Sequence, residues 1–158
     1  MDQNRVADRM DQNRVVARYQ DGRAVKGTTQ DFFPNRPMFH VQSVDGSRAI
    51  EVHVRELKAV FFVKELDGQP GRKDLRGFLD APGENPHGKK IAVRFKDNEL
   101  LCGYSLSYLP DREGFFVFPS DSASNNLRIY VIIAATAEVK AGPAADALAQ
   151  KVLASNSG

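Results

Sequence analysis

Residues 15–27, VVARYQDGRAVKG, decide the fold of this chain, because residues 91–103, IAVRFKDNELLCG, repeat their pattern 76 positions later. The apolar alternation and the turn residues agree between the two stretches. Four further pairs keep the same offset: Pro34 with Pro110, Arg36 with Arg112, Phe39 with Phe115, and Val41 with Val117. We interpret this correspondence as an internal repeat, in which each copy is one structural unit.

Each copy begins with a predicted β-hairpin. In its first six residues the first, third and fifth positions are apolar and the fourth and sixth are polar, which is typical of a strand with one buried face. Asp21-Gly22 follows in the first copy and Asp97-Asn98 in the second. Both pairs favour a type I′ turn, in which the two central residues have positive φ. The returning strands contain Gly27 and Gly103, where we expect a bulge or a sharp bend.

The remainder of each copy is also extended. A loop with proline leads to a third strand, and two more apolar stretches follow, such as the alternating residues 50–54. Each copy therefore contains about five short strands. We predict an all-β protein of two tandem, homologous, five-stranded small barrels with a short C-terminal helix.

The predicted organisation has five parts. Residues 2–6 recur as 11–15 with Met10 before the second version, a Gly- and Pro-rich stretch separates the copies, and the tail is rich in alanine. The predicted parts are a disordered or artefactual extension at 1–12, a first barrel at 13–66, a linker loop at 67–88, a second barrel at 89–140, and a short helix with a disordered tail at 141–158. We expect the helix near 143–153.

Composition excludes several classes of protein. The 158 residues include 22 Lys and Arg against 20 Asp and Glu, a balance that argues against a dedicated DNA-coating protein. The single cysteine, Cys102, excludes an internal disulfide and a cysteine-based zinc site, and it suits a reducing cytosol. No apolar run reaches the length of a membrane span, and no apolar stretch of a signal peptide begins the chain. We therefore expect a cytoplasmic protein without membrane contact.

Catalytic motifs are missing from the sequence. His40, His53 and His87 share no metal-ligand spacing, and the first two are out of phase with the apolar residues of their strands. There is no Walker loop, Gly-x-Ser-x-Gly or Gly-x-Gly-x-x-Gly motif. We predict no enzyme activity, no metal and no cofactor.

The first copy resembles Sm-like proteins. The resemblance rests on a strand, Asp-Gly-Arg at 21–23, a strand glycine at 27, the acidic-aromatic pair Asp31-Phe32, and the later stretch VHVRELKAV at 52–60. It implies Sm-like barrels, which bind single-stranded RNA through loop residues and form rings through exposed strand edges. Single-stranded RNA binding is therefore an alternative function.

The chain also resembles a little-characterised bacterial family associated with PilZ-type signalling proteins. The similar residues are RYQDGR at 18–23, KGT at 26–28, DFFP at 31–34 and RP at 36–37. PilZ proteins bind cyclic di-GMP through Arg-x-x-x-Arg and a later Asp/Asn-x-Ser-x-x-Gly. Arg14 and Arg18 have the first spacing, and the second motif does not follow. The resemblance implies a second alternative, cyclic dinucleotide binding at a degenerate site.

Three pairs of adjacent phenylalanines, at 32–33, 61–62 and 115–116, place one ring of each pair outside its own barrel core. The barrels either bury these rings between them, or present them to a partner or a nucleic-acid base. Basic residues near the rings suit phosphates or acidic side chains. The candidate ligand or partner surface consists of Arg18, Arg23, Lys26, Phe32, Arg36, Arg94, Arg112 and Phe116.

Four of these arginines recur in both copies. We expect Arg36 and Arg112 to tie their loops to carboxylates such as Asp31 or Asp111, and Arg18 and Arg94 to serve binding. The predicted function is a non-enzymatic binding or regulatory module of a bacterial cytoplasm. It engages a protein partner or an anionic ligand, as a monomer or as a homo-oligomer formed through strand edges.

Overall fold

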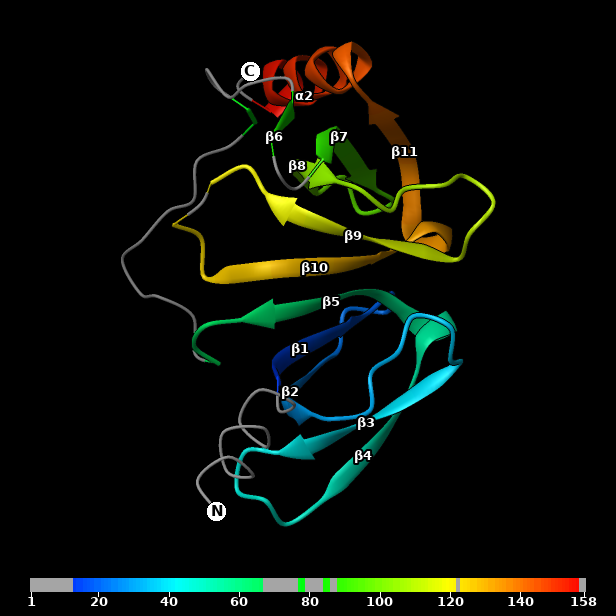
Figure 1. The fold of residues 1–158 in the computed structure, drawn as a ribbon, viewed down its shortest axis with the longest axis vertical. Helices are drawn as coiled ribbons and strands as arrows, with labels where there is room; N and C mark the ends of the chain where they lie inside the picture. The colour runs from blue at the N-terminus through cyan, green and yellow to red at the C-terminus, as the bar shows by residue number, and fades with distance from the viewer. Residues whose placement is uncertain (1–12, 67–76, 79–83, 86–87, 122, 157–158) are drawn as a thin grey trace.

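The structure, a computed structural model, is mostly antiparallel β-sheet with one C-terminal helix (Figure 1). It describes residues 13–66, 77–78, 84–85, 88–121 and 123–156. The predicted extension at 1–12 and most of the linker at 67–88 lie outside these residues. The prediction of an all-β protein with a short C-terminal helix is confirmed.

The elements fall into two series. The first series is β1 (Asn13–Tyr19), β2 (Ala24–Thr29), β3 (Met38–Ser43), β4 (Ala49–His53), the 3-10 turn η1 (Val54–Glu56) and β5 (Leu57–Val63). The second is β6 (Glu84–Asn85), β7 (Gly88–Phe95), β8 (Leu100–Ser105), β9 (Gly114–Pro119), β10 (Asn126–Ile132), the 3-10 turn η2 (Ile133–Ala135), β11 (Thr136–Ala141) and the helix α2 (Pro143–Asn156).

All described strands belong to one sheet. Its order is β11-β7-β8-β9-β10-β5-β1-β2-β3-β4, with β6 paired to β7 off this path. The first half, β1 to β5, and the second half, β7 to β11, therefore have the same strand order. The halves join where β10 pairs with β5, at the centre of the molecule (Figure 1).

The register also corresponds between the halves. Val15 pairs with Gly27 and Ile91 with Gly103, which keeps the offset of 76 positions. Beyond the third strand the offset becomes 79, so that η1 corresponds to η2. The sheet nevertheless stays open, because among the described residues β4 pairs only with β3, and β11 only with β7. The predicted closed barrels are therefore not confirmed.

The hairpin turns lie where the sequence predicts them but differ in type. Gly22 has a φ of 97° and Asn98 a φ of 74°, whereas Asp21 and Asp97 have no positive φ. Tyr19 N–H donates to the Arg23 carbonyl at 2.9 Å, and Gly22 N–H donates to the Tyr19 carbonyl at 3.1 Å. This pattern is a three-residue loop with a type I turn and a left-handed residue, so the prediction of a type I′ turn is wrong.

Close backbone approach explains the two strand glycines. The ladder between β1 and β2 passes Gly27 without a register shift, and that between β7 and β8 passes Gly103 in the same way. A Cβ at Gly27 would overlap the Gln42 carbonyl oxygen, and one at Gly103 would overlap the Phe118 carbonyl oxygen. Of the predicted bulge or sharp bend, the bulge is wrong, and glycine is needed here to let the third strand approach the second.

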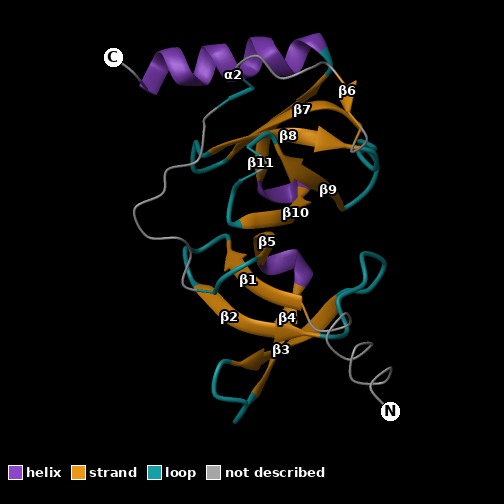
Figure 2. Cartoon of the chain, turned by 60° about the vertical axis from the view of Figure 1, so that its left-hand side comes forward, coloured by secondary structure: helices purple, strands orange, loops and turns teal. Residues whose placement is uncertain are grey.

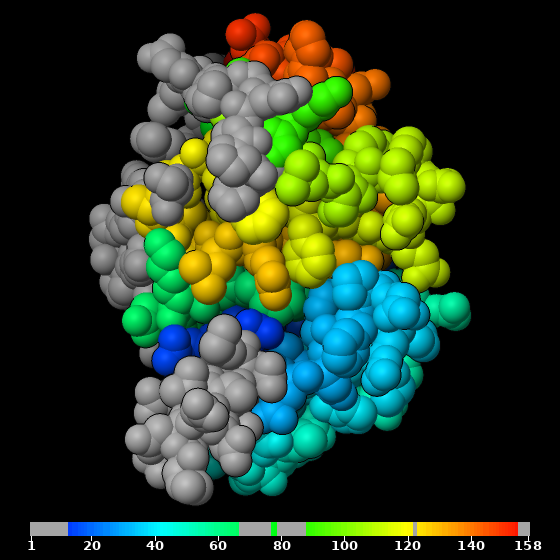
Figure 3. Space-filling view, viewed as in Figure 1, coloured from blue at the N-terminus to red at the C-terminus, as the bar shows by residue number. Residues whose placement is uncertain are grey.

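Two hydrophobic cores share the strands at the junction. Tyr130 and Ile132 of β10 belong to the core of the first half, and Ala59 of β5 belongs to the core of the second. Adjacent residues of a strand face opposite sides, so each junction strand contributes to both cores. On the face shown in Figure 3, the connection between β2 and β3, in light blue, also lies against the second half.

Helix α2 packs on β7, β8 and β11 (Figure 2). Its buried residues are Ala145, Leu148, Ala149 and Val152, which share a small core with Phe78, Ala92 and Cys102. Lys90 of β7 donates to the Asp146 carboxylate at 3.0 Å. In the described part of the chain, no helix is both long enough and apolar enough to cross a membrane.

Candidate ligand groove

A groove begins at the junction of the two halves and continues into the second half. It consists of an outer cavity of about 510 Å³ and an adjoining inner cavity of about 190 Å³, which share Phe61, Glu99 and Asn126 in their walls. We call these two cavities together the junction groove. The outer cavity is lined by Val16, Arg18, Lys26, Lys58, Phe61, Val63, Leu66, Glu99, Asn125 and Asn126.

Two exposed cations stand side by side on the first wall. Val16 pairs with Lys26 and Arg18 with Ala24, so Arg18 and Lys26 are diagonal neighbours on one face of β1 and β2. The Arg18 guanidinium lies 5.7 Å from the centroid of the Phe61 ring. Neither cation has a carboxylate within ion-pair distance among the described residues. Both charges are therefore open to an incoming anion.

The third cation of the groove, Lys58, is already paired. Its ammonium donates to Asp97 Oδ2 at 2.8 Å and also to the Glu99 carboxylate, and it lies 4.7 Å from the centroid of the Phe95 ring. Burial alone raises the pKa of Asp97, but hydrogen bonds from Lys58 and from the Glu99 backbone outweigh it and lower that pKa overall. Lys58 is therefore shared between two carboxylates and offsets one of their two negative charges.

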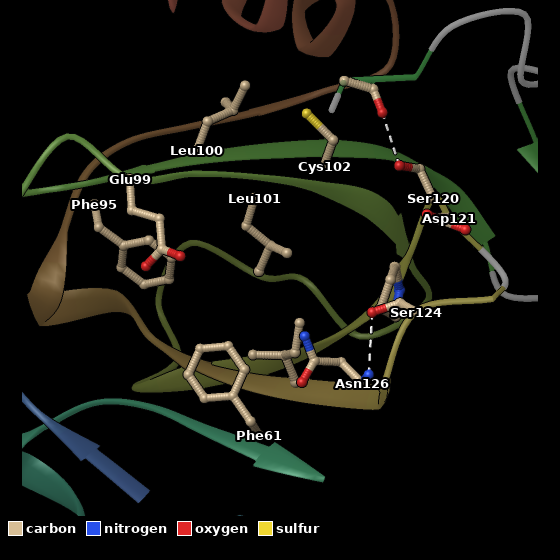
Figure 4. A pocket seen from close by; sticks show the side chains of 13 residues that line it. Phe61, Phe95, Glu99, Leu100, Leu101, Cys102, Ser120, Asp121, Ser124 and Asn126 are labelled. Carbon is tan, nitrogen blue, oxygen red and sulfur yellow. Dashed lines mark hydrogen bonds between the residues drawn. The ribbon is translucent and has the colours of Figure 1, made fainter. Parts of the chain in front are cut away.

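The opposite wall carries amides and hydroxyls. Asn125 accepts a hydrogen bond from Glu65 N–H and donates one to the Glu65 carbonyl, each at 3.0 Å, which fixes the end of β5 beside β10. Ser124 Oγ accepts from Asn126 N–H at 3.0 Å. Leu101 extends from β8 toward Phe61 and Asn126 in the inner cavity (Figure 4). The groove therefore combines an apolar interior with a polar rim.

Residues 11–141 match the model of a family of unknown function (DUF6982). The chain belongs to that family. The match includes all strands of both halves and ends before α2. No curated protein matches the chain, and no solved structure matches it.

In this DUF6982 chain, the eight predicted surface residues do not form one patch. Arg18 and Lys26 share the junction groove, whereas Phe32 and Phe116 are half-buried and pack against the first core with ring centroids 6.2 Å apart. The remaining four are exposed or half-buried at separate places: Arg23 pairs with Asp21 at 2.8 Å, Arg36 stacks on Phe33 at 4.7 Å, Arg94 lies 3.4 Å from Glu138, and Arg112 is exposed between β8 and β9.

Phe32 and Phe116 belong to an aromatic cluster that joins the halves. Phe32 contacts Tyr130 at a centroid distance of 5.2 Å, and Phe116 contacts Phe62 at 6.0 Å. The Arg128 guanidinium lies 4.6 Å from the Phe62 ring and 5.0 Å from the Phe116 ring, and burial lowers its pKa. Of the two interpretations of the paired phenylalanines, packing between the halves fits these two half-buried rings better than presentation to a partner.

The other rings of the three phenylalanine pairs also pack against one of the two cores, with the exception of Phe33. Phe61 packs against the core of the second half, while its neighbour Phe62 belongs to the core of the first. Phe115 and Phe116 divide in the same way between the two cores. Phe33 is the exception, since 46% of its surface is exposed.

The described contacts of Arg36 and Arg94 differ from those expected for the repeated arginines. Asp31 accepts a hydrogen bond from His40 N–H at 2.8 Å, and its other oxygen lies 2.7 Å from His40 Nδ1. The Thr29 hydroxyl also donates to Asp31 at 3.2 Å, so the described partners of this carboxylate are His40 and Thr29 rather than Arg36. Burial raises the pKa of Asp31, but these bonds lower it overall. Arg94, expected to be free for binding, is half-buried and also donates to Asn98 at 3.0 Å.

Three residues of the junction were not predicted from the sequence: Asn125, Asn126 and Arg128. Their positions depend on the pairing of β10 with β5, which joins segments more than 60 residues apart. Local alternation reports which face a residue occupies, not which strand lies beside it. The remaining sequence signals are consistent with the structure, since His40 and His53 are exposed and Cys102 is buried.

Proposed function

We propose that this chain is a non-enzymatic binding module of a bacterial cytoplasm, that its halves are homologous Sm-like units, and that the junction groove binds an anionic ligand. The common strand order, the constant register offset and the equivalent 3-10 turns support homology of the halves. Within the open sheet, the pairing of β10 with β5 joins the two units.

One observation carries the ligand proposal. Arg18 and Lys26 lie together beside the half-buried ring of Phe61, without a carboxylate partner among the described residues. Two adjacent cations suit a phosphate or carboxylate group, and the part of the Phe61 ring that lines the cavity suits a planar ring. The amide-bearing rim at Asn126 supplies donors and acceptors for orientation.

The chemistry of the groove supports binding rather than catalysis. No histidine lines either cavity among the described residues, and the one cysteine there, Cys102, is buried. The acid in the outer cavity, Glu99, is paired with Lys58. None of these groups has the arrangement of a base beside a nucleophile.

Nucleotides are the anions that the groove fits best. They combine phosphate with a planar base, as the Sm-like resemblance also implies for single-stranded RNA. A cyclic dinucleotide is the second candidate, because Arg18 lies in the groove while Arg14, four residues earlier, donates to the Lys64 carbonyl at 3.0 Å at the edge of the same junction.

Titration of the purified chain tests the proposal. We expect a labelled single-stranded RNA oligonucleotide or cyclic di-GMP to bind at low salt, and binding to weaken as salt rises. The double variant Arg18→Gln/Lys26→Gln should weaken binding at least about tenfold, because two charge-assisted bonds are lost. Arg48→Gln, an exposed cation of the β3–β4 turn, is the matched control and should leave binding unchanged.

Two results would overturn the proposal. The first is no binding of either probe at low salt, where electrostatic attraction is strongest. The second is equal loss in the groove variant and in the Arg48 control, which would show attraction to net charge without a site.

A further inference from the structure

We propose that Glu99 selects the base of the bound nucleotide, and that the junction groove prefers guanine to the other bases. This inference deepens the proposed function and rests on it, since it names the class of nucleotide that the groove takes. It starts from the position of Glu99, which lines both the outer and the inner cavity.

The Glu99 carboxylate is held in place without using its full capacity to accept hydrogen bonds. Glu99 N–H donates to Asp97 Oδ1 at 3.0 Å, which fixes the backbone, and the Lys58 ammonium donates to Glu99 Oε1, which fixes the side chain. The second oxygen, Oε2, has no donor among the described residues, and 54% of the side chain is exposed. Because a carboxylate has about four acceptor sites, Glu99 can take two more donors from a ligand.

The charges of the groove give a ligand one preferred orientation. Lys58 carries one positive charge, whereas its partners Asp97 and Glu99 carry two negative charges. One negative charge is therefore in excess on this wall, while Arg18 and Lys26 on the other wall have no carboxylate partner among the described residues. A nucleotide places its phosphate at the two cations and its N–H donors at Glu99, because the reverse orientation brings two negative groups together.

The ring of Phe61 connects the cationic wall with the acidic one. Phe61 lines both cavities, and its ring centroid lies 5.7 Å from the Arg18 guanidinium. Leu101 extends toward Phe61 in the inner cavity, and Glu99 borders the same space (Figure 4). Asn126 also lines both cavities, and its side-chain amide has no hydrogen bond within the described ranges. A base that stacks on Phe61 thus lies in one groove with a free carboxylate oxygen and a free amide.

Guanine is the base whose edge matches a carboxylate. Its Watson–Crick edge carries two adjacent donors, N1–H and the N2 amino group, which fit the two oxygens of Glu99. In adenine and cytosine the amino donor lies next to an acceptor nitrogen, and in uracil the single N–H lies between two carbonyl acceptors. A carboxylate repels all of these acceptors, because it has no proton to donate. A site that is built to accept two N–H donors discriminates strongly against ligands that lack them.

Nucleoside monophosphates test the preference in the full-length chain at low salt. We expect guanosine 5′-monophosphate to bind at least about tenfold more tightly than the adenosine, cytidine and uridine 5′-monophosphates, because two charge-assisted hydrogen bonds are at stake. Calorimetric or NMR titration measures the four affinities under one set of conditions.

Two analogues of the ligand keep the test decisive without any change to the protein. Inosine 5′-monophosphate keeps N1–H but lacks the N2 amino group, so its affinity should fall between those of the guanosine and adenosine forms. The 7-deaza form of guanosine 5′-monophosphate keeps the whole Watson–Crick edge and should bind as tightly as the natural nucleotide. Loss of binding by the 7-deaza form would show that a cation such as Arg18 reads N7, and it would overturn the role of Glu99.

The variant Glu99→Gln tests the residue itself. The amide replaces one acceptor oxygen with a donor, so the preference for guanine over adenine should fall at least about fivefold. Glu113→Gln, which changes an exposed carboxylate between β8 and β9 outside both cavities, is the matched control and should keep the preference. Melting curves of both variants verify that they fold.

The possible failures of this inference differ from failure of the proposed function. Equal binding of the four monophosphates, or an unchanged preference in Glu99→Gln, would overturn the selection by Glu99 and leave anion binding intact. Absence of binding by every monophosphate would overturn it as well, and the separate titration of single-stranded RNA and cyclic di-GMP then decides whether the groove binds anions at all.

Discussion

Lys58 Nζ on β5 lies 2.8 Å from Asp97 Oδ2 in the β7–β8 turn, so a charge of the first half is bonded to a turn of the second. The side chain of Lys58 is only 12% exposed, whereas that of Asp97 is 57% exposed. Asp97 also accepts a bond from the Glu99 backbone at 3.0 Å, which fixes its turn. One carboxylate therefore shapes a hairpin and holds the two halves together.

Removing this lysine should destabilise the chain moderately. Lys58→Met keeps the apolar stem and loses the charge, and we expect a loss of about 1 kcal/mol at neutral pH, because the acidic partners stay in contact with solvent. Since the pKa of Asp97 is lowered by folding, its contribution is present above the ordinary value of about 3.9 and is lost as pH falls through the lower folded value. Denaturant unfolding at a series of pH values should show the difference between the two proteins shrinking in acid. A constant difference down to the lowest pH would contradict the assignment.

The equivalent glycines provide a test of backbone packing. We expect Gly27→Ala and Gly103→Ala each to destabilise the chain by about 2 kcal/mol or more, because the added Cβ overlaps a carbonyl oxygen of the next strand. Gly22→Asn is the matched control, since Asn98 holds the equivalent left-handed position in the second half. Thermal melts of the three variants decide the matter, and an unchanged melting temperature for Gly103→Ala would show that the third strand can move.

Local sequence signals were sufficient to predict the hairpins but not the way in which the halves join. The pairs Asp21-Gly22 and Asp97-Asn98 mark both turns correctly, because a left-handed residue is needed there in either turn type. The continuous apolar run of β5 is what a strand buried on both faces looks like. Its second neighbour, β10, is distant in sequence, so the partner could not be identified from periodicity.

The sequence predicts only part of the candidate site, because strand pairing between distant segments brings the other residues to it. Arg18 and Lys26 were predicted as basic residues near the paired phenylalanines, and the register of the hairpin places them on one face. Asn126 and Arg128 enter the junction through long-range pairing and carry no local signal. Phe32 and Phe116 were expected either between the halves or on an exposed surface, and the structure packs both rings, half-buried, between the halves.

The β3–β4 turn should contain the carboxyl with the lowest pKa among those described. The pKa of Asp45 is lowered to about 2, first by the side-chain and backbone hydrogen bonds from Ser47 and then by that from Ser43. We expect an NMR titration to find this value, and Ser47→Ala to raise it toward the ordinary value of about 3.9. Thr136→Ala, which removes a hydroxyl in a distant turn, is the control and should leave the Asp45 titration unchanged. An ordinary pKa in the unmodified chain would show that the turn is not formed in solution.

The equivalent arginines Arg18 and Arg94 should differ in what their loss changes. Arg94 is half-buried and lies 3.4 Å from Glu138, whose pKa is lowered chiefly by the hydrogen bond from Arg94. The residue equivalent to Glu138 beside Arg18 is Ala59, so Arg18 lacks this partner. We therefore expect Arg94→Gln to lower the melting temperature by about 2–4 °C, and Arg18→Gln to change it by no more than about 1 °C. Anion binding should respond in the opposite sense, falling for Arg18→Gln and holding for Arg94→Gln. Melting curves and titrations on the same two preparations measure both effects. Equal changes in melting temperature and in anion affinity for the two variants would contradict the different roles assigned to Arg18 and Arg94.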